Sequence, residues 1–336
     1  NYDPYEINDV WVQKYPDFAG VCCRMVAFAL LREAAKSVRK GLGRMEQEEL
    51  EQLASTISLQ MNSLMSDQDL VNSSKWVLEM DLADYVAIKQ AYVMLKKNSG
   101  AIDFDDMLHF VYEWLCVQKY EPVIQWCRRT WRYLFVDEFQ DTNPIQLGII
   151  QAILGEDNPA DRLVVVGDDD QCIYEWRGTD PRILINICGY FDLKKRYLTT
   201  NYRCPEVVVH RAGMCVKNMF EREDKSMISN KAGGSVEIID ITPKKEYKWK
   251  NPICIGSANV AERILAQVNG AEGVCLEKAI CVLTRNNATM RILANMLYAQ
   301  GVAVKGQKSM QISQCLEWKT LASILRLVDK TCMITN

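Results

Sequence analysis

The sequence predicts an α/β fold in which a helical N-terminal region precedes parallel sheets. Two observations carry this prediction. Apolar residues of the first hundred positions recur at helical spacing, and from Arg132 onward the texture changes to short apolar runs that stop at polar loops. Runs without polar alternation, separated by stretches long enough for a helix, are typical of parallel strands buried on both faces. The predicted strands are YLFV (133–136), RLVVV (162–166), RYLTT (196–200), VEII (236–239) and AICVL (279–283).

Two apolar stripes define the helical region. The first follows spacings of three or four residues, and the second repeats the pattern until the KKNSG segment breaks it. Each stripe is expected to face a core. The stripes are Leu50, Leu53, Ile57, Met61 and Leu64, then Tyr85, Ile88, Tyr92 and Leu95.

Composition sets limits on the class of protein. The 336 residues suffice for about two domains. Apolar residues make up 49% and charged residues 25%, and no run of about 18 apolar residues could span a membrane. A net charge of −3 argues against a protein that coats nucleic acid non-specifically. Thirteen cysteines without a CxxC pair, with only two histidines, predict free thiols in a reducing cytoplasm and argue against a zinc site.

Polar groups follow several predicted strands at the edge where ligands bind parallel sheets. Asp137 and Glu138 come directly after YLFV, and GDDDQ follows RLVVV. Crowded carboxylates repel one another, so a Mg²⁺-nucleotide would relieve them: one carboxylate holds the cation and the neighbouring Glu activates a water. The alternative is a surface pair that caps a following helix, since residues 141–144 are also a plausible helix start.

The segment GDDDQCIYEWRG (167–178) adds two further groups. Gln171 is an uncharged side chain able to hydrogen-bond a terminal phosphate. Tyr174 and Trp176 stand two residues apart, so an extended backbone would point both rings the same way, with Arg177 beside them. Aromatic faces and a guanidinium suit a single-stranded nucleic acid, because any base can stack on them. The alternative is a Tyr and a Trp packed in a domain interface.

Five ordered motifs give the sequence a family resemblance. VDEFQDTN, VVGDDDQCIYEWRG and LTTNYRC resemble the second, third and fourth motifs of the UvrD/Rep/PcrA-like superfamily 1 DNA helicases. IDFDDML (102–108) is similar to an upstream element of that family, and VLTRNNATMR (282–291) to a downstream one. The match runs from about residue 100 to the end. Asp103, Asp105 and Asp106 in the upstream element can equally be helix-start acids.

The resemblance implies a fold and a domain plan. It implies RecA-like parallel-sheet domains of the P-loop NTPase type with an N-terminal helical insert subdomain. Residues 1–103 would form the mostly helical subdomain. Residues 104–195 would be part of the first RecA-like domain, and residues 196–336 part of the second, with a linker near residues 192–196.

The resemblance also assigns roles at the nucleotide. Asp137 would help to hold Mg²⁺ and Glu138 would activate the hydrolytic water. Gln171 would contact the γ-phosphate of ATP, Arg203 would act as an arginine finger from the second domain, and Arg285 would lie near the nucleotide. Tyr174, Trp176 and Arg177 would contact single-stranded DNA, with Trp176 as the main stacking platform.

The implied activity is an ATP-dependent DNA helicase or translocase, 3′–5′, acting on single strands or junctions. A nuclease or a repair or defence protein could accompany it. The family's GxxxxGK[ST] phosphate loop and its terminal motifs are absent from the sequence, which begins at Asn1, so we expect a truncated chain with little ATPase activity alone. The alternative is a non-catalytic relative that binds nucleic acid or protein. Intact Asp137, Glu138, Gln171 and Arg203 weigh against it.

Overall fold

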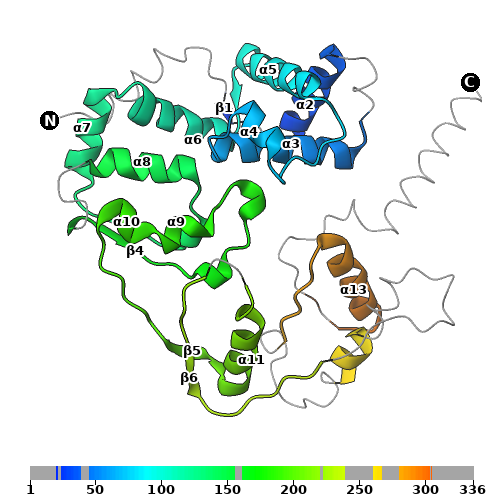
Figure 1. Ribbon diagram of the computed structural model, residues 1–336. Helices are drawn as coiled ribbons and strands as arrows, with labels where there is room; N and C mark the ends of the chain where they lie inside the picture. Colours follow the sequence, from blue (N-terminus) through cyan, green and yellow to red (C-terminus); the bar gives the residue numbers. More distant parts are fainter. Residues whose placement is uncertain are drawn as a thin grey trace, which may run out of the picture. The chain divides into compact units, whose positions relative to one another are not determined.

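The structure is a computed structural model of the chain (Figure 1). Contacts within the chain divide it into two compact units, residues 1–236 and 237–336. The predicted boundaries at 103/104 and 195/196 stay predictions. The residues that the structure describes are 20–21, 24–38, 45–155, 161–219, 222–238, 260–266, 280–302 and 304.

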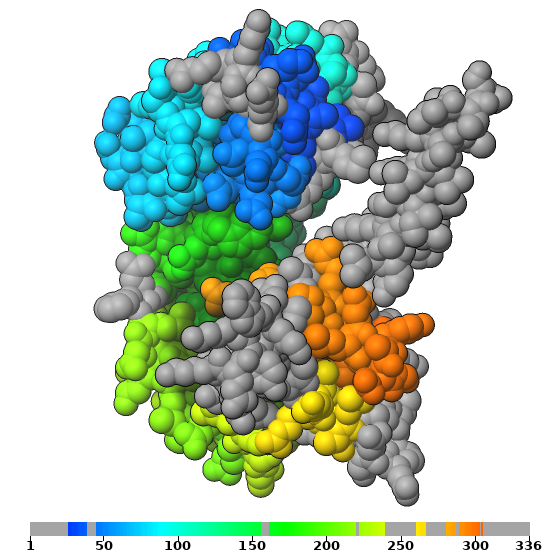
Figure 2. Space-filling model, turned by 90° about the vertical axis from the view of Figure 1, so that its right-hand side faces the viewer, coloured from blue at the N-terminus to red at the C-terminus, as the bar shows by residue number. Residues whose placement is uncertain are grey.

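In the described part of the helical region, four helices surround one core. They are α2 (Arg24–Val38), α3 (Gln47–Asn62), α4 (Asp67–Asn72) and α5 (Leu82–Asn98). Ser66 and Asp81 are the N-caps of α4 and α5. Each side chain accepts a hydrogen bond from the backbone N–H three residues further on, at Asp69 and Asp84 respectively. In Figure 2 these helices form one continuous blue and cyan surface.

The predicted stripes pack into this core. Leu50, Leu53 and Ile57 of α3 are buried against Tyr85 and Ile88 of α5, which confirms the predicted helical faces. Leu64 is the exception, because α3 ends at Asn62 and Leu64 has a left-handed backbone (φ 54°) with an exposed side chain. The helical prediction is therefore correct except at the last residue of its first stripe.

A buried ionic cluster joins the helical region to the next segment. Strand β1 (Gly20–Val21) pairs in parallel with β2 (Ala101–Ile102), and α6 (Phe104–Tyr112) follows. Asp103 and Asp106 form a capping box at the start of α6, and the buried Lys96 of α5 donates to both, at 2.7 and 2.6 Å. Asp105 accepts a hydrogen bond from Asn62 at 2.8 Å. The helix-start interpretation of these acids therefore fits the structure.

The first predicted strands form a parallel pair with one covered face. A π-helical turn (Glu113–Val117) and α7 (Glu121–Thr130) lead into β3 (Leu134–Val136), and α8 (Pro144–Leu154) leads to β4 (Leu163–Val165). The two strands are parallel, as the sequence predicts, and Leu134 pairs with Leu163 and Val136 with Val165. One face packs on α8, α9 (Pro181–Ile185) and α10 (Ile187–Phe191).

The other face of this strand pair is open. Phe135 is 76% exposed, and Val164 and Val166 are 47% and 52% exposed. The prediction that both faces are buried is therefore wrong for this pair within the chain. Alternate side chains of a strand point to opposite faces, and only one face meets covering helices here.

The strands after residue 195 differ more from the prediction. Strand β5 spans Thr200–Pro205, so it begins where the predicted strand 196–200 ends. Helix α11 (Glu206–Val216) follows, and β6 (Ile228–Lys231), which the sequence did not predict, pairs with β5 in parallel. Residues 236–238 and 280–283 are not strands, and the remaining positions of those predicted runs, 239 and 279, lie outside the described residues.

The second unit is described through its helices. Residues 260–266 are helical, and α13 spans Asn287–Ala299 with Asn286 as its N-cap. Ala261, Leu293 and Leu297 form its buried core. In the first unit, the sheets of the described residues are parallel strand pairs combined with helices, which agrees with the α/β class. None of the described helices has the length and apolarity needed to cross a membrane.

Candidate functional site

The end of β3 places two carboxylates on an exposed turn. Asp137 and Glu138 follow Val136, and both side chains are exposed. Glu138 has a left-handed backbone (φ 51°), which costs a non-glycine residue roughly 1 kcal/mol or more and is common at functional sites. Phe139, fully buried, anchors the turn, and its N–H donates to Val166 O at 2.9 Å. The buried ring and this bond hold the strained residue in place.

Helix α8 does not use these acids as its cap. Asn143 is the N-cap, its side chain accepts from Gln146 N, and Pro144 occupies the first helical turn. The alternative interpretation of Asp137 and Glu138 as helix-capping acids is therefore wrong, because Asn143 already fills that position.

Gln140 connects the end of β3 to the end of β4. This side chain is only 2% exposed, and its amide nitrogen donates to Glu138 Oε2 at 2.7 Å. Its amide oxygen accepts from the backbone N–H of Asp168 at 3.0 Å. A Cβ at Gly167 would come within 2.8 Å of that same oxygen, so glycine permits the close approach. Sequence reasoning missed Gln140, although its place two residues after Glu138 was a signal.

The hydrogen bonds continue to Gln171. Its side-chain nitrogen donates to Asp168 Oδ2 at 2.6 Å, and the rest of the side chain is exposed. A continuous series of contacts therefore links Glu138, Gln140, Asp168 and Gln171. The structure thus brings two predicted site residues, Glu138 and Gln171, into one network across the carboxyl ends of β3 and β4.

The acids Asp168, Asp169 and Asp170 are neutralised by a distant segment. Lys225 Nζ lies 2.5 Å from Asp168 Oδ1 and 3.5 Å from Asp170 Oδ2, and it also contacts Asp169. Arg222 binds Asp170 through two nitrogens, at 2.8 and 2.9 Å. The hydrogen bond from Arg222 holds the pKa of Asp170 below its ordinary value. No pattern in the sequence indicated these partners.

Asp137, Glu138 and Asp141 differ, because they lack such partners in the part of the chain that the structure describes. Among the described residues, no lysine or arginine forms an ion pair with any of them. The Oδ1 atom of Asp141 is buried without a hydrogen bond, and burial together with the charge of Glu138 raises the pKa of Asp141.

The donor set fits a cation that keeps most of its own waters. The described part of the chain contains no group of three or more His, Cys, Asp or Glu arranged around a metal. Mg²⁺ commonly takes one or two carboxylates and fills its remaining positions with water and substrate phosphates. Asp137 offers such a carboxylate on an exposed turn, with Oδ1 also accepting from Glu138 N at 2.9 Å.

The aromatic group lies on a tight turn. Tyr174 and Trp176 have ring centroids 6.4 Å apart, and the Arg177 guanidinium lies 5.3 and 4.7 Å from them. The predicted extended backbone is wrong, because Glu175–Arg177 is a 3₁₀ turn closed by a hydrogen bond from Gly178 N to Glu175 O at 3.0 Å. The rings nevertheless remain neighbours.

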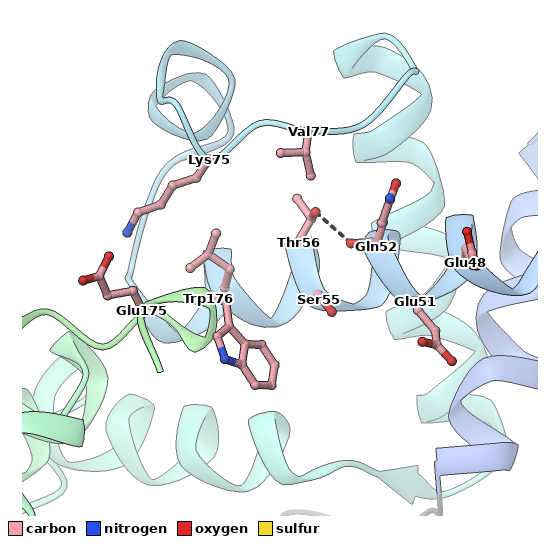
Figure 3. Close-up of a pocket in the computed structure, with 10 residues that line it drawn as sticks. Glu48, Glu51, Gln52, Ser55, Thr56, Lys75, Val77, Glu175 and Trp176 are labelled. Carbon is pink, nitrogen blue, oxygen red and sulfur yellow. Dashed lines mark hydrogen bonds between the residues drawn. The ribbon is translucent and has the colours of Figure 1, made fainter. Parts of the chain in front are cut away.

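Trp176 also borders a pocket. The open pocket, of about 590 Å³, lies between the 3₁₀ turn and α3, and Figure 3 shows the indole of Trp176 on the same side of that helix as Ser55. Trp176 is 56% exposed and Tyr174 is 36% exposed, so neither ring is packed away in an interface. Both rings are therefore partly exposed to solvent, with the Arg177 guanidinium beside them.

The two remaining predicted residues lie on separate elements. Arg203 is exposed on β5, where its N–H donates to Asn201 Oδ1 at 2.9 Å. Arg285 belongs to the second unit, is exposed, and directly precedes the N-cap of α13. The hydrogen-bond series described above includes neither arginine.

Comparison with known proteins gives a family. The model of the UvrD/REP helicase N-terminal domain matches residues 17–191, about half of the chain. ATP-dependent DNA helicase Rep of Escherichia coli is 27% identical over 296 residues, which is 87% of this chain and 41% of Rep. ATP-dependent DNA helicase UvrD1 of Mycobacterium tuberculosis is 28% identical over 255 residues, which is 74% of this chain and 32% of UvrD1.

The matches reach further towards the N-terminus than the sequence motifs do, but they cover only part of each relative. The family match begins at residue 17, so it includes the helical region, for which the motifs had suggested only a loose similarity. The chain spans about a third to two fifths of the length of these relatives. The chain belongs to the UvrD/REP helicase N-terminal domain family.

Proposed function

We propose that this chain is part of an ATP-dependent DNA helicase or translocase that couples ATP hydrolysis to 3′–5′ movement along single-stranded DNA. The observation that carries the proposal is the hydrogen-bond series from Glu138 through Gln140 and Asp168 to Gln171. It joins a candidate water-activating carboxylate to a candidate phosphate sensor. Both stand at the carboxyl ends of parallel strands, where nucleotides bind RecA-like sheets.

The acids at the end of β3 would handle the nucleotide. Asp137 would hold Mg²⁺, which would neutralise charge on the β- and γ-phosphates of ATP. Glu138 would orient and deprotonate the attacking water. Its exposed carboxylate is held on one side by Gln140, which leaves the other oxygen for that water.

Gln171, Arg203 and Arg285 would read the state of the phosphate. Gln171 holds Asp168 in this structure, and its amide could exchange that bond for the γ-phosphate. Arg203 would approach the same phosphate as an arginine finger, and Arg285 would lie near the nucleotide. ATP binding would close the two RecA-like domains and hydrolysis would reopen them, and this cycle would move the DNA-binding surface.

Tyr174, Trp176 and Arg177 would contact the DNA. Tyr174 lies three residues after Gln171 in the chain. A shift of Gln171 towards a phosphate would therefore also move the turn that carries the aromatic rings. Exposed rings with a nearby guanidinium suit bases of any sequence, which a translocating protein must accept.

A longer parent protein would complete the site. RecA-like helicases need a phosphate loop whose backbone and lysine hold the triphosphate, and the sequence contains no GxxxxGK[ST]. The exposed apolar face of Phe135, Val164 and Val166 is consistent with further elements that would cover it. We therefore expect this chain alone to hydrolyse ATP poorly, whereas the parent hydrolyses it with DNA as the stimulus.

The experiment compares Glu138→Gln with the unchanged parent protein in a single-strand-stimulated ATPase assay. We expect turnover to fall about 100-fold or more, because general-base catalysis is lost, while ATP still binds. Glu79→Gln is the matched control, since Glu79 is also an exposed glutamate and lies on a loop of the helical region. Unchanged turnover in Glu138→Gln would sink the assignment.

A second readout separates the rival interpretation. Trp176→Ala should weaken single-strand binding by about tenfold, the loss of one base-stacking contact. Trp131→Ala is its control, because Trp131 is 41% exposed and lies on the connection between α7 and β3. If Trp176→Ala weakens DNA binding while Glu138→Gln leaves ATP turnover unchanged, the chain is a non-catalytic binding relative.

A further inference from the structure

One short segment contacts both of the elements that carry the candidate phosphate-sensing residues. We propose that residues 222–231, here called the strap, form a positioning device that sets Gln171 and the Arg203 strand in one geometry, with Lys225 as its main positioning residue. This proposal rests on the proposed function of Gln171 and Arg203. It assigns work to residues outside the motifs, none of which would touch the nucleotide.

The first half of the strap grips the loop that carries Gln171. Lys225 lies among three consecutive carboxylates, and its side chain is only 11% exposed. Arg222 binds Asp170 through two nitrogens, and Glu223 N donates to Asp169 Oδ2 at 2.8 Å. All three acids of the loop are therefore held by three residues of the strap, Arg222, Glu223 and Lys225.

Asp168 transmits this grip to Gln171. Its Oδ1 atom meets Lys225 Nζ at 2.5 Å, and its Oδ2 atom accepts from Gln171 Nε2 at 2.6 Å. The orientation of the Gln171 amide thus depends on a carboxylate that Lys225 fixes. Without the ammonium, three adjacent negative charges would repel one another, and the loop would lose its single arrangement.

The second half of the strap pairs with the strand that carries Arg203. Ile228 N donates to Thr199 O at 2.8 Å, and the Ser229 hydroxyl donates to Cys204 O at 2.7 Å. The Lys231 ammonium donates to the backbone oxygen of Arg203 itself at 3.1 Å. Two residues separate Lys225 from the start of β6, too few for a flexible link. A movement of the Gln171 loop would therefore pull on the Arg203 strand.

A double-mutant cycle in the parent protein tests the strap. Lys225→Met should lower the single-strand-stimulated kcat for ATP by about tenfold. In a Gln171→Ala background the same change should lower kcat by less than about twofold, because the residue through which Lys225 acts is already gone. Lys225→Gln, which removes the charge and keeps a donor, is measured alongside in case the methionine variant does not fold.

The matched control is Lys195→Met. Lys195 forms an ion pair with Glu223 of the same strap but touches none of the three acids, so its loss should change kcat by less than about twofold. The proposal is overturned if the Lys225 variants keep full turnover, or if they lose the same factor with and without Gln171. If Gln171→Ala alone leaves turnover unchanged, the proposed role of Gln171 fails first, and the strap proposal fails with it.

Discussion

Two acidic clusters end neighbouring strands, and the protein treats them in opposite ways. At the end of β4, Asp168, Asp169 and Asp170 are paired with Lys225 and Arg222. At the end of β3, Asp137, Glu138 and Asp141 lie within the same unit with no ion-pair partner among the described residues. The sequence presents both clusters as acids after an apolar run. The difference indicates that the cluster at the end of β4 has a structural role, whereas in the function that we propose the cluster at the end of β3 would bind Mg²⁺.

Paired and unpaired acids have opposite effects on the stability of the fold. Charges that a protein neutralises internally cost it stability if either partner is lost. Charges that it leaves unneutralised repel one another and cost stability while they remain. Removing a charge should therefore lower the free energy of unfolding at the paired cluster and raise it at the unpaired one.

The largest effect is expected at the paired cluster. Arg222→Met removes two charge-assisted hydrogen bonds and leaves Asp170, a mostly buried carboxylate, with Lys225 at 3.5 Å. We expect the free energy of unfolding to fall by roughly 2 to 3 kcal/mol. Urea denaturation of the chain measures the change.

Arg211→Met is the control for that measurement. Arg211 is exposed on α11, so its replacement should change the free energy of unfolding by about 0.5 kcal/mol or less. Equal losses in the two variants would mean that the Asp170 pair contributes no more than an ordinary surface arginine, and the structural interpretation of this cluster would be wrong.

The next effect is expected at the side chain that joins the clusters. Gln140→Leu removes the donor to Glu138 and the acceptor for Asp168 N, both at a buried position. An unsatisfied buried N–H costs about 1 to 2 kcal/mol, so the free energy of unfolding should fall by that amount. Gln90→Leu, exposed on α5, is the control. A lower free energy of unfolding in Gln140→Leu but not in Gln90→Leu, measured by urea denaturation, would support the role of Gln140 in connecting the two strand ends. Equal stability of the two variants would argue against it.

The sequence predicted those parts of the molecule that depend on local pattern. The faces of α3 and α5, the strands β3 and β4 and their parallel pairing follow from apolar spacing, and all are confirmed. The position of Asp137 and Glu138 directly after a strand is likewise a local property. The turn at Tyr174 was predicted wrongly, because alternation over three residues cannot distinguish an extended strand from a 3₁₀ turn.

The parts that were missed depend on contacts distant in sequence. Arg222 lies 52 residues from Asp170, and Lys225 lies 57 residues from Asp168. Strand β6 reads Ile-Ser-Asn-Lys, which has no apolar pattern, and it forms only because β5 offers its edge. The open face at Phe135 could not be foreseen either, since its residues are as apolar as those of a covered strand.

The smallest effect is a pH dependence that reverses between the clusters. The pKa of Asp170 is lowered by its bond to Arg222, so the ionised carboxylate stabilises the fold, and this contribution is lost as pH falls through the lowered pKa. The pKa of Asp141 is raised by burial and by Glu138, so protonation stabilises the fold, and that contribution is lost as pH rises through the raised pKa. At neutral pH the charge is therefore favourable at Asp170 and unfavourable at Asp141.

Asparagine at each position separates the two signs. At pH 7, Asp170→Asn should lower the free energy of unfolding, whereas Asp141→Asn should raise it by roughly 0.5 kcal/mol, within the range of single partly exposed charges. Below the ordinary carboxyl pKa near 4, Asp141 is neutral, so its difference should vanish there; Asp170 becomes neutral only below its lowered pKa, so its difference should shrink progressively as pH falls from about 4 towards that pKa. Urea denaturation from pH 3 to pH 7 measures this. If Asp141→Asn destabilises the chain at pH 7 as Asp170→Asn does, then Asp141 has a partner that neutralises it, and the cluster at the end of β3 is not one that needs a cation.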